Sequence, residues 1–387
     1  MGTATKKTDP HVLPSKSKPP NSDLTNKDSN TTTESKNPNL AQQYGGIHTG
    51  SWVSHLPAHW VPYIQLSRLS PPVAISLIYF PHLFGALHAA ILLNSTPLAL
   101  LKTSLSLLLG TIFFSNAAHA WNDLIDSPID ALTSRTKTRP IPRGAITPRA
   151  AFLFACSQAV GAAAVLVLLT PRWESTVYYA VPNIMATMYY PFAKRHSHFV
   201  QVVLGVCLGW GVLMGASAMG VNPVSINAFP APYYPAAATT TTGFKFTTWG
   251  VGGVDVEVTV VPSVLWLFLA SATWSVLYDT IYAHQDLQDD VKNGVKSLAV
   301  LFRGATKYLL WGLLCIMGTA LVSSGVAGGF SRWSGVIAAG GSSLALGGMI
   351  WGVDLTDSGS CWWWFKSGYW LTGLSITSAL MGEYFFA

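Results

Sequence analysis

The chain alternates apolar runs of about twenty residues with short polar breaks, and no other feature constrains its fold as strongly. A helix needs about twenty apolar residues to cross the roughly 30 Å hydrocarbon core of a bilayer. We therefore predict an all-α, multi-pass membrane protein with nine transmembrane helices. The predicted spans are 73–94, 98–120, 148–169, 174–192, 198–219, 261–283, 307–326, 332–353 and 367–386.

The composition excludes most other classes of protein. Only 10% of the 387 residues are charged and 50% are hydrophobic, whereas soluble domains carry about 25% charged residues. This excludes a disordered chain and a disulfide scaffold, and we expect no nucleic-acid partner. The four cysteines have no C-x-x-C spacing, so we interpret them as reduced, small hydrophobic residues.

The polar N-terminal segment differs from the rest of the chain. Residues 1–50 lack an apolar run, so they cannot bury enough surface to fold, and we predict a disordered cytosolic tail there. Its acidic residues and its lack of arginine argue against a mitochondrial transit peptide. Residues 51–387 form the membrane domain, with an extramembrane insertion at 221–260 in which alternating valines allow a short hairpin.

The distribution of Lys and Arg predicts the orientation. With nine spans, 18 of the 23 basic residues fall on the side that contains the tail and the loops after the second, fourth and sixth spans. Basic residues are enriched on the cytoplasmic side of membrane proteins. We therefore expect these three loops to face the cytosol.

The acidic residues are concentrated in two short segments on that same side. Thirteen acidic residues lie outside the tail, and seven of them fall within 121–130 and 278–290. A carboxylate in the hydrocarbon core costs about 2.5–3.5 kcal/mol even on insertion scales. A single one, such as Asp123 or Asp279, can be explained as a helix-end acid, but the two complete segments require a positively charged partner.

The spacing within these segments indicates a divalent cation. Asn122, Asp126 and Asp130 lie four residues apart, as do Asp286 and Asp290, so each set lines one face of a helix. The donors are oxygens without a Cys/His cluster, which favours Mg²⁺ over Zn²⁺ and, with Mg²⁺, a diphosphate substrate. We interpret the neighbouring histidines, His119 and His284, as packed or solvated residues.

Basic residues accompany both acidic segments. They can clamp phosphate oxygens, in bidentate fashion for Arg, or they can act only as determinants of topology. They are Arg135, Lys137, Arg139, Arg143, Lys194, Arg195, Lys292 and Lys296.

These motifs resemble those of the UbiA superfamily of intramembrane prenyltransferases. The run NDLIDSPID, residues 122–130, matches its N-D-x-x-D-x-x-x-D motif, and YDTIYAHQDLQDDVKNGVKSLA, residues 278–299, resembles the second signature of its para-hydroxybenzoate polyprenyltransferase branch. TRPIPRG, YYPFAKRHSHFVQVVLGVCLGW and VPYIQLSRLSPP also agree. The resemblance extends over about 60–386, apart from the insertion.

The resemblance implies a helix bundle around a central cavity and assigns roles to residues within it. The catalytic residues would be Asn122, Asp126 and Asp286. The Mg²⁺ site would comprise Asn122, Asp123, Asp126, Asp130, Asp286, Asp289 and Asp290, with Asp123 and Asp289 in support. The diphosphate and the acceptor would be bound by Arg68, Arg139, Lys194, Arg195, Lys296 and Tyr282.

One departure from the family bears on the acceptor. The ubiquinone enzymes usually have Lys- or Arg-Pro-Ile-Gly where this chain reads LSPP after Arg68. The chain therefore resembles more closely the fungal meroterpenoid enzymes, which join a short prenyl chain to a phenolic polyketide, and we expect farnesyl as the prenyl group here. The alternative within the family is the para-hydroxybenzoate polyprenyltransferase of ubiquinone biosynthesis.

Two other classes of membrane protein fit the sequence less well. A cation-coupled transporter would need acids near the middle of the membrane, and a CDP-alcohol phosphotransferase would need a D-G-x-x-A-R motif that the sequence lacks. An enzyme in the lipid bilayer is therefore the preferred interpretation. We expect the endoplasmic reticulum or another endomembrane, with the mitochondrial inner membrane as the second choice.

Overall fold

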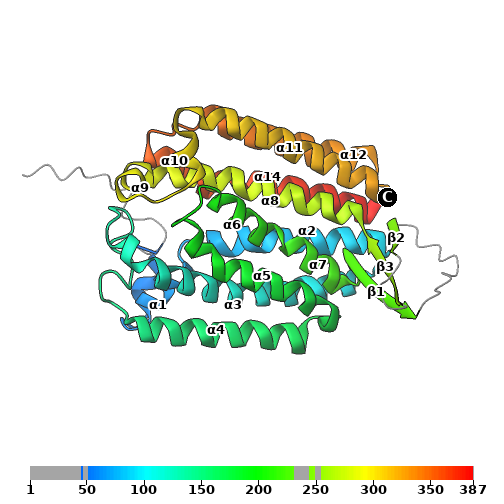
Figure 1. Ribbon diagram of the computed structural model, residues 1–387, viewed down its shortest axis with the longest axis horizontal. Coiled ribbons are helices and arrows are strands. Elements are labelled where there is room, and N and C mark those ends of the chain that lie inside the picture. The colour runs from blue at the N-terminus through cyan, green and yellow to red at the C-terminus, as the bar shows by residue number, and fades with distance from the viewer. Residues whose placement is uncertain (1–44, 47–50, 231–243, 249–253, 387) are drawn as a thin grey trace, which may run out of the picture. The chain divides into compact units, whose positions relative to one another are not determined.

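Long, nearly parallel helices build the domain (Figure 1). The computed structural model describes residues 45–46, 51–230, 244–248 and 254–386. Almost all of the predicted 1–50 tail lies outside these residues. The chain divides into two units, 1–37 and 38–387, and every described residue belongs to the second unit.

The helices coincide with the predicted spans, with short helices between them. The predicted spans correspond to α2 (Val73–Leu92), α3 (Pro97–Asp130), α4 (Pro148–Leu169), α5 (Trp173–Ala193), α6 (Val200–Gly209) with α7 (Gly211–Met219), α8 (Pro262–Ala283), α11 (Thr306–Gly328), α12 (Arg332–Gly335) with α13 (Gly341–Gly352), and α14 (Ser358–Phe386). The short helices are α1 (Val61–Leu66), α9 (Leu287–Asn293) and α10 (Leu298–Phe302).

The all-α prediction is confirmed, but the number of spans is not. Seven helical stretches among the described residues are long and apolar enough to cross a membrane. The other two, α5 and α14, overlap the fourth and ninth predicted spans. Both contain charged or polar residues, such as Glu174, Asn183 and Glu383, so the total of nine stays a prediction.

The termini of α3 follow from its sequence. The Thr96 side chain accepts a hydrogen bond from the Ala99 backbone N–H at 3.3 Å, and Pro97 occupies the first turn, which is a favourable helix start. The 34 residues of α3 correspond to about 51 Å. This length exceeds the hydrocarbon core, so α3 can carry the first acidic segment at its C-terminal end to the membrane surface.

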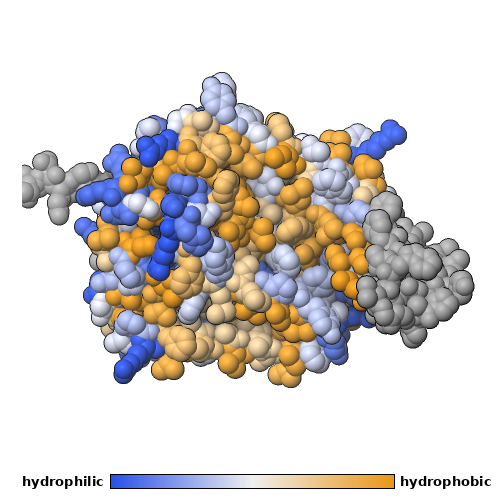
Figure 2. All heavy atoms as spheres, in the orientation of Figure 1, coloured by the Kyte–Doolittle hydropathy of each residue, from blue (hydrophilic) through white to orange (hydrophobic). Residues whose placement is uncertain are grey.

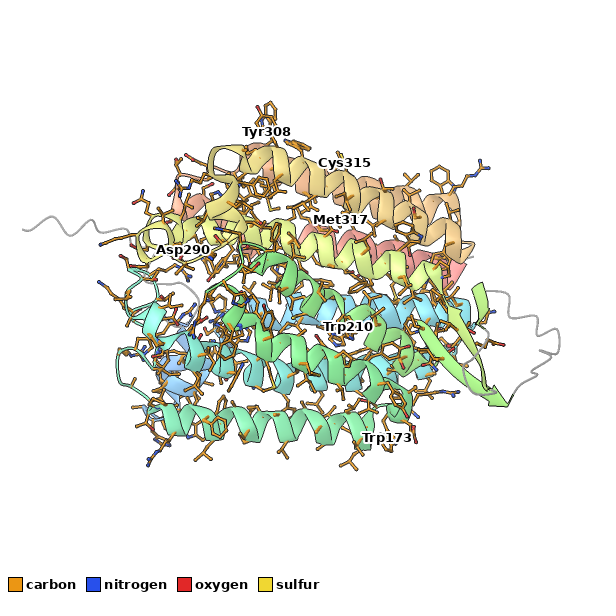
Figure 3. All side chains as sticks on the ribbon, viewed as in Figure 1. Trp173, Trp210, Asp290, Tyr308, Cys315 and Met317 are labelled. Atoms are coloured by element: carbon orange, nitrogen blue, oxygen red, sulfur yellow. The ribbon has the colours of Figure 1, made fainter. Side chains whose placement is uncertain are left out.

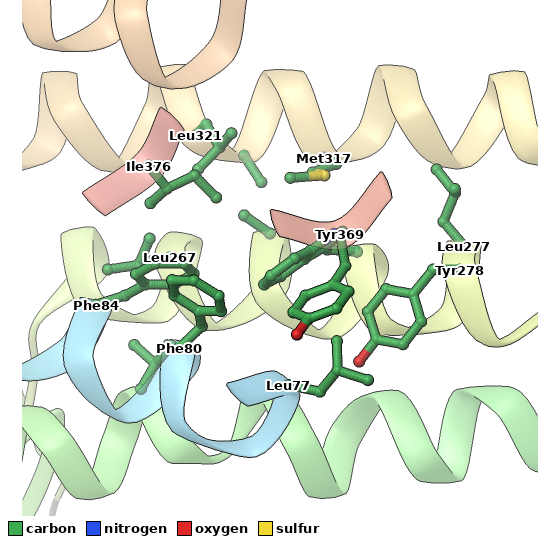
Figure 4. Close-up of a cluster of buried hydrophobic side chains, with 14 of the residues drawn as sticks. Leu77, Phe80, Phe84, Leu267, Leu277, Tyr278, Met317, Leu321, Tyr369 and Ile376 are labelled. Atoms are coloured by element: carbon green, nitrogen blue, oxygen red, sulfur yellow. The ribbon is translucent and has the colours of Figure 1, made fainter. Parts of the chain in front are cut away.

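A core rich in aromatic residues joins α2, α8, α11 and α14. Phe80 and Phe84 of α2 contact Trp274 of α8, with ring centroids 6.1 and 6.0 Å apart, and Tyr369 of α14 lies 6.3 Å from Phe80. Figure 4 shows Phe80, Phe84 and Tyr369 between the helices, with Met317 of α11 near them. This packing fixes the helices that carry the second acidic segment.

The insertion forms a small sheet. Strands β1 (Val224–Pro230) and β2 (Phe244–Thr248) flank β3 (Val254–Val260), and both pair antiparallel with it. The predicted hairpin is therefore present as β2 and β3, with β1 as a third strand. The sheet lies at the end of the bundle opposite α9 and α10 (Figure 1).

The surface of the bundle is suited to lipid. Orange, hydrophobic residues cover much of the face in Figure 2, with hydrophilic residues mainly toward its ends. Large apolar side chains such as Leu168, Val326 and Leu344 are highly exposed. The protein is an integral membrane protein whose apolar surface faces hydrocarbon rather than water.

We predict that the close contact between α2 and α7 depends on two glycines. A Cβ atom on Gly85 would lie 2.0 Å from the Val212 carbonyl oxygen, and one on Gly215 would lie 2.1 Å from that of His82. Replacing either with Ala should destabilise the protein by about 1–3 kcal/mol, because the helices must separate. Thermal unfolding in detergent measures this loss. Gly312→Ala is the control, since a Cβ there meets nothing within 4 Å; equal stability of all three variants would contradict the prediction.

Candidate active site

The C-terminal end of α3 presents the first acidic segment. The helix continues to Asp130, so Asn122, Asp126 and Asp130 lie along one face, as their spacing predicts. Asp123 and Asp126 are completely buried and Asp130 is almost so. These carboxylates are therefore part of the interior of the protein, where each needs a compensating charge.

The second segment departs from the sequence prediction. Asp286 and Asp290 were expected on one continuous α-helix. Instead α8 ends at Ala283, a 3₁₀ turn spans His284–Asp286, and Asp290 lies on α9. The φ angle of Asp286 is −106°, outside the α-helical range, so that prediction is wrong at this break.

A cavity of about 230 Å³ lies between the two segments. Its walls come mainly from α2, α3, α5, α6 and α8, with the loop that follows α3. The predicted site residues that line it are Arg68, Asn122, Asp130, Arg139, Lys194, Tyr282, Asp286, Asp290 and Lys296. The remaining four, Asp123, Asp126, Asp289 and Arg195, are not among its lining residues.

Arg135 holds the second segment. Its Nε and Nη2 donate to the two carboxylate oxygens of Asp286 at 2.8 and 2.6 Å, and its Nη1 donates to the Tyr282 hydroxyl at 2.9 Å. Nearby, the Ser134 backbone N–H donates to Asp289 at 2.7 Å. The loop after α3 is therefore fastened to α9 and to the turn before it.

Asp123 is the centre of a second group of charges. Its Oδ1 accepts hydrogen bonds from Arg68 at 2.7 Å and from Arg139 at 3.2 Å, and Arg139 also binds Asp130 at 2.8 Å. Arg68 has a φ angle of 53°, a left-handed conformation that costs a non-glycine residue roughly 1–2 kcal/mol. The buried ion pair with Asp123 accompanies this strained backbone, so Asp123 positions two arginines at the cavity.

Lys194, which directly follows α5, forms an ion pair with the first acidic segment. Its Nζ donates to Oδ2 of Asp126 at 2.5 Å, and its backbone carbonyl accepts a hydrogen bond from the Lys296 N–H at 3.0 Å. Arg195, in contrast, donates to the Ile125 carbonyl at 2.7 Å. The three loops predicted to share one face of the membrane therefore contact one another, and Figure 3 shows Asp290 at the opposite end of the bundle from Trp173.

The paired carboxylates raise the pKa of two loop arginines. Burial alone would lower the pKa of Arg135, but the Asp286 carboxylate outweighs it and raises the pKa well above its usual value. Burial likewise opposes the charge of Arg139, and Asp130 and Asp123 together raise its pKa. Both guanidinium groups are therefore positively charged wherever the protein is folded.

A second, apolar groove continues from the charged cavity. It has a volume of about 440 Å³ and is lined by α3, α4 and α5. Phe114, Ala118 and Thr187 line both spaces. Several of its other lining residues, including Phe152, Val181 and Met188, are exposed. The groove therefore runs from the charged groups to the lipid-facing surface between α4 and α5.

The oxygen atoms at the cavity fit a hard cation only in part. Within the described residues, no three His, Cys, Asp or Glu side chains form a cluster able to hold a metal ion. However, Oδ1 of Asn122 and Oδ1 of Asp126 are buried without a hydrogen-bond partner. They lie one turn apart on α3, and unsatisfied buried oxygens of this kind suit Mg²⁺.

The sequence comparison identifies this arrangement. The UbiA prenyltransferase family matches residues 78–374, a stretch that contains both acidic segments and the helices that present them. The chain belongs to this family. As a UbiA prenyltransferase it is an enzyme that transfers prenyl groups, and the transporter alternative is set aside.

Individual relatives agree with the family. The mitochondrial 4-hydroxybenzoate polyprenyltransferase of Schizosaccharomyces pombe is 31% identical, covering 85% of this chain and 82% of the relative. The polyprenyl transferase ausN of Aspergillus calidoustus is 33% identical, covering 85% and 81%. A UbiA homolog from Archaeoglobus fulgidus bound to DMAPP and Mg²⁺ has a TM-score of 0.55 at 15% identity, covering 84% of this chain and 99% of that one. At this identity the likeness shows the fold alone.

For two residues of this UbiA prenyltransferase, the sequence did not indicate their position at the cavity. The sequence does not distinguish Arg135 from the other basic residues of its loop. Its pairing with Asp286 is a tertiary contact between residues that are 151 positions apart in the chain. His119 was interpreted as a packed or solvated residue, but it lines the charged cavity. Its position three residues before Asn122, on the same face of α3, was the available signal.

We predict that Arg135→Gln destabilises the protein by about 3–5 kcal/mol, because it leaves a mostly buried carboxylate without its partner. Adding Asp286→Asn should recover most of that loss, since the unpaired charge is then removed. Thermal unfolding without Mg²⁺ measures both effects. The control is Lys137→Gln in the same loop, where the side chain is exposed and a change within about 0.5 kcal/mol is expected. A double variant no more stable than Arg135→Gln would contradict the pairing.

Proposed function

We propose that this UbiA prenyltransferase transfers a prenyl group from its diphosphate to a ring carbon of a phenolic acceptor, with Mg²⁺ as its cofactor. The proposal rests on one observation: the charged cavity and the apolar groove adjoin each other. One holds carboxylates and basic side chains, and the other is almost entirely apolar. A prenyl diphosphate has the same division between a charged head and a hydrocarbon tail.

The diphosphate head and Mg²⁺ are assigned to the charged cavity. Asn122, Asp126 and Asp130 would hold the metal from α3, and Asp286 and Asp290 from the second segment, with Asp123 and Asp289 in support. The unpartnered oxygens of Asn122 and Asp126 favour this assignment. Bound Mg²⁺ supplies charge stabilisation for the leaving diphosphate. The Archaeoglobus fulgidus homolog, bound to DMAPP and Mg²⁺, is consistent with it.

The basic residues would change partners when the diphosphate enters. Arg135 and Lys194 now bind Asp286 and Asp126, the carboxylates that the metal requires. A diphosphate offers these cations a stronger set of acceptor oxygens, and their transfer would release both carboxylates. Arg139 and Lys296 also line the cavity and complete the clamp. Arg195 contributes indirectly, through its bond to the α3 backbone.

The volume of the groove favours a farnesyl donor. A dry cavity of about 150 Å³ accommodates benzene, which has six carbons. By the same proportion, the 440 Å³ of the groove has room for roughly fifteen to eighteen carbons. A farnesyl chain has fifteen, whereas the much longer chains of a polyprenyl donor would extend out between α4 and α5 into lipid.

The acceptor is assigned to the space beside the diphosphate. An orsellinate-type phenol is the first choice, in keeping with the fungal meroterpenoid branch, and 4-hydroxybenzoate is the second because of the 4-hydroxybenzoate relatives. Tyr278 and Tyr282 line the cavity, where their rings can stabilise an allylic cation. The apolar walls exclude water, which would otherwise quench this cation to an alcohol. We place the enzyme in an endomembrane, with the mitochondrial inner membrane as the alternative.

We predict that Asp126→Asn and Asp286→Asn each reduce prenyl transfer by at least about 100-fold, because charge stabilisation of the leaving group is lost. The assay uses purified protein, Mg²⁺, farnesyl diphosphate and either orsellinic acid or 4-hydroxybenzoate, with products identified by mass spectrometry. Glu174→Gln is the control, since this acid is exposed in the first turn of α5. Full activity in both Asp variants would refute the site. Absence of any prenylated phenol with the unmodified protein would refute the function.

The groove yields a separate prediction on chain length. Thr111 is buried, lines the groove and lies eight residues, or about 12 Å along α3, beyond His119. Thr111→Phe should therefore reduce the use of farnesyl diphosphate at least tenfold relative to geranyl diphosphate. Competition between the two donors measures the ratio. Leu109→Phe is the matched control, because Leu109 is exposed on the same helix. A ratio unchanged in Thr111→Phe would place the tail elsewhere.

A further inference from the structure

His119 lies where the charged cavity meets the apolar groove. It lines the charged cavity between Ala118, which borders both spaces, and Asn122. A prenyl diphosphate with its head at Asn122 and its tail beyond Ala118 has its reactive carbon between these two residues. The acceptor ring must approach that carbon, so the bond that forms lies beside the His119 imidazole.

The hydrogen bonds of His119 fix which of its nitrogens is available. Its Nδ1 lies 2.7 Å from the Ser115 carbonyl oxygen and 3.2 Å from the Ser115 hydroxyl. A carbonyl oxygen only accepts, so Nδ1 carries the hydrogen. In the neutral ring Nε2 then carries the lone pair. His119 therefore offers the cavity a nitrogen that can accept a proton.

Burial and the charged groups near His119 keep its ring neutral before the reaction. Asp123 lies four residues further along α3, a spacing that places the two side chains on the same side of the helix. This carboxylate is completely buried and belongs to the ion-pair group with Arg68 and Arg139. The Asp123 carboxylate favours a proton on the ring, but burial and the Arg68 guanidinium outweigh it, so Nε2 stays unprotonated before the reaction and can accept the proton of the attacked carbon.

We propose that His119 is the base that completes prenyl transfer, an inference that rests on the proposed function. The allylic C–O bond breaks, and its electron pair leaves with the diphosphate. A π pair of the phenol ring forms the new C–C bond. The proton on the attacked ring carbon passes to Nε2 of His119, its C–H pair restores aromaticity, and the imidazolium returns the proton to the departing diphosphate.

The decisive variant is His119→Gln, tested in the full-length protein with Mg²⁺ and farnesyl diphosphate. The acceptor is whichever of orsellinic acid and 4-hydroxybenzoate gives product, in its ordinary and ring-deuterated forms. Loss of a general base should slow product formation by about 10²–10⁴-fold. Diphosphate release should continue with farnesol as the co-product, so prenylated product per diphosphate falls well below one. Ring deuteration should slow the variant at least about twofold, because deprotonation limits its rate, but should leave the unmodified enzyme unaffected.

His284→Gln is the matched control. The His284 Nδ1 also lies close to the carbonyl four residues earlier, 2.8 Å from that of Thr280, but His284 is buried outside the cavity lining. Its product per diphosphate should stay near one without an isotope effect, even if its rate falls. The same result in His119→Gln would overturn the proposal, and so would a fall in product without an isotope effect, which indicates a positioning role. Failure of the proposed function is distinct, because the unmodified protein would then form no prenylated phenol.

Discussion

Neutralisation of buried carboxylates is the constraint on which the structure depends. Seven carboxylates in two segments lie next to a hydrocarbon environment, where an unpaired charge is very costly. For four of them, Asp123, Asp126, Asp130 and Asp286, the fold resolves this by bringing cations from three separate stretches of chain. Arg68 precedes α2, Arg135 and Arg139 follow α3, and Lys194 follows α5. The same ion pairs that stabilise the fold thus gather the groups that a diphosphate requires.

The division of the interior into a charged and an apolar space follows from the length of α3. Its last turns carry the acidic segment, and its middle turns carry small or apolar residues such as Gly110, Phe114 and Ala118, which line the groove. One rigid helix therefore sets the distance between the head and the tail of a bound substrate. A residue at the boundary, such as His119, is placed at the reacting carbon without any movement of the backbone.

Much of this arrangement could be predicted from local sequence patterns. The apolar runs predicted the helices, and the spacing of Asn122, Asp126 and Asp130 predicted that they share one face of α3. Both predictions depend only on local sequence patterns such as helix periodicity. The break between Asp286 and Asp290 could not be predicted, since periodicity does not show where a helix tightens to a 3₁₀ turn. The pairing of Arg135 with Asp286 depends on how a loop folds back across the bundle, which no local pattern contains.

The glycine contact between α2 and α7 has a consequence for how the enzyme meets its membrane. Because the backbones of α2 and α7 touch at Gly85 and Gly215, these two helices cannot move closer together. Away from this contact α4 is largely exposed, and the groove beside it opens between α4 and α5. Lipid acyl chains therefore border the groove that we assign to the prenyl tail. We therefore expect the thickness and order of the surrounding bilayer to influence which prenyl chains the groove accepts.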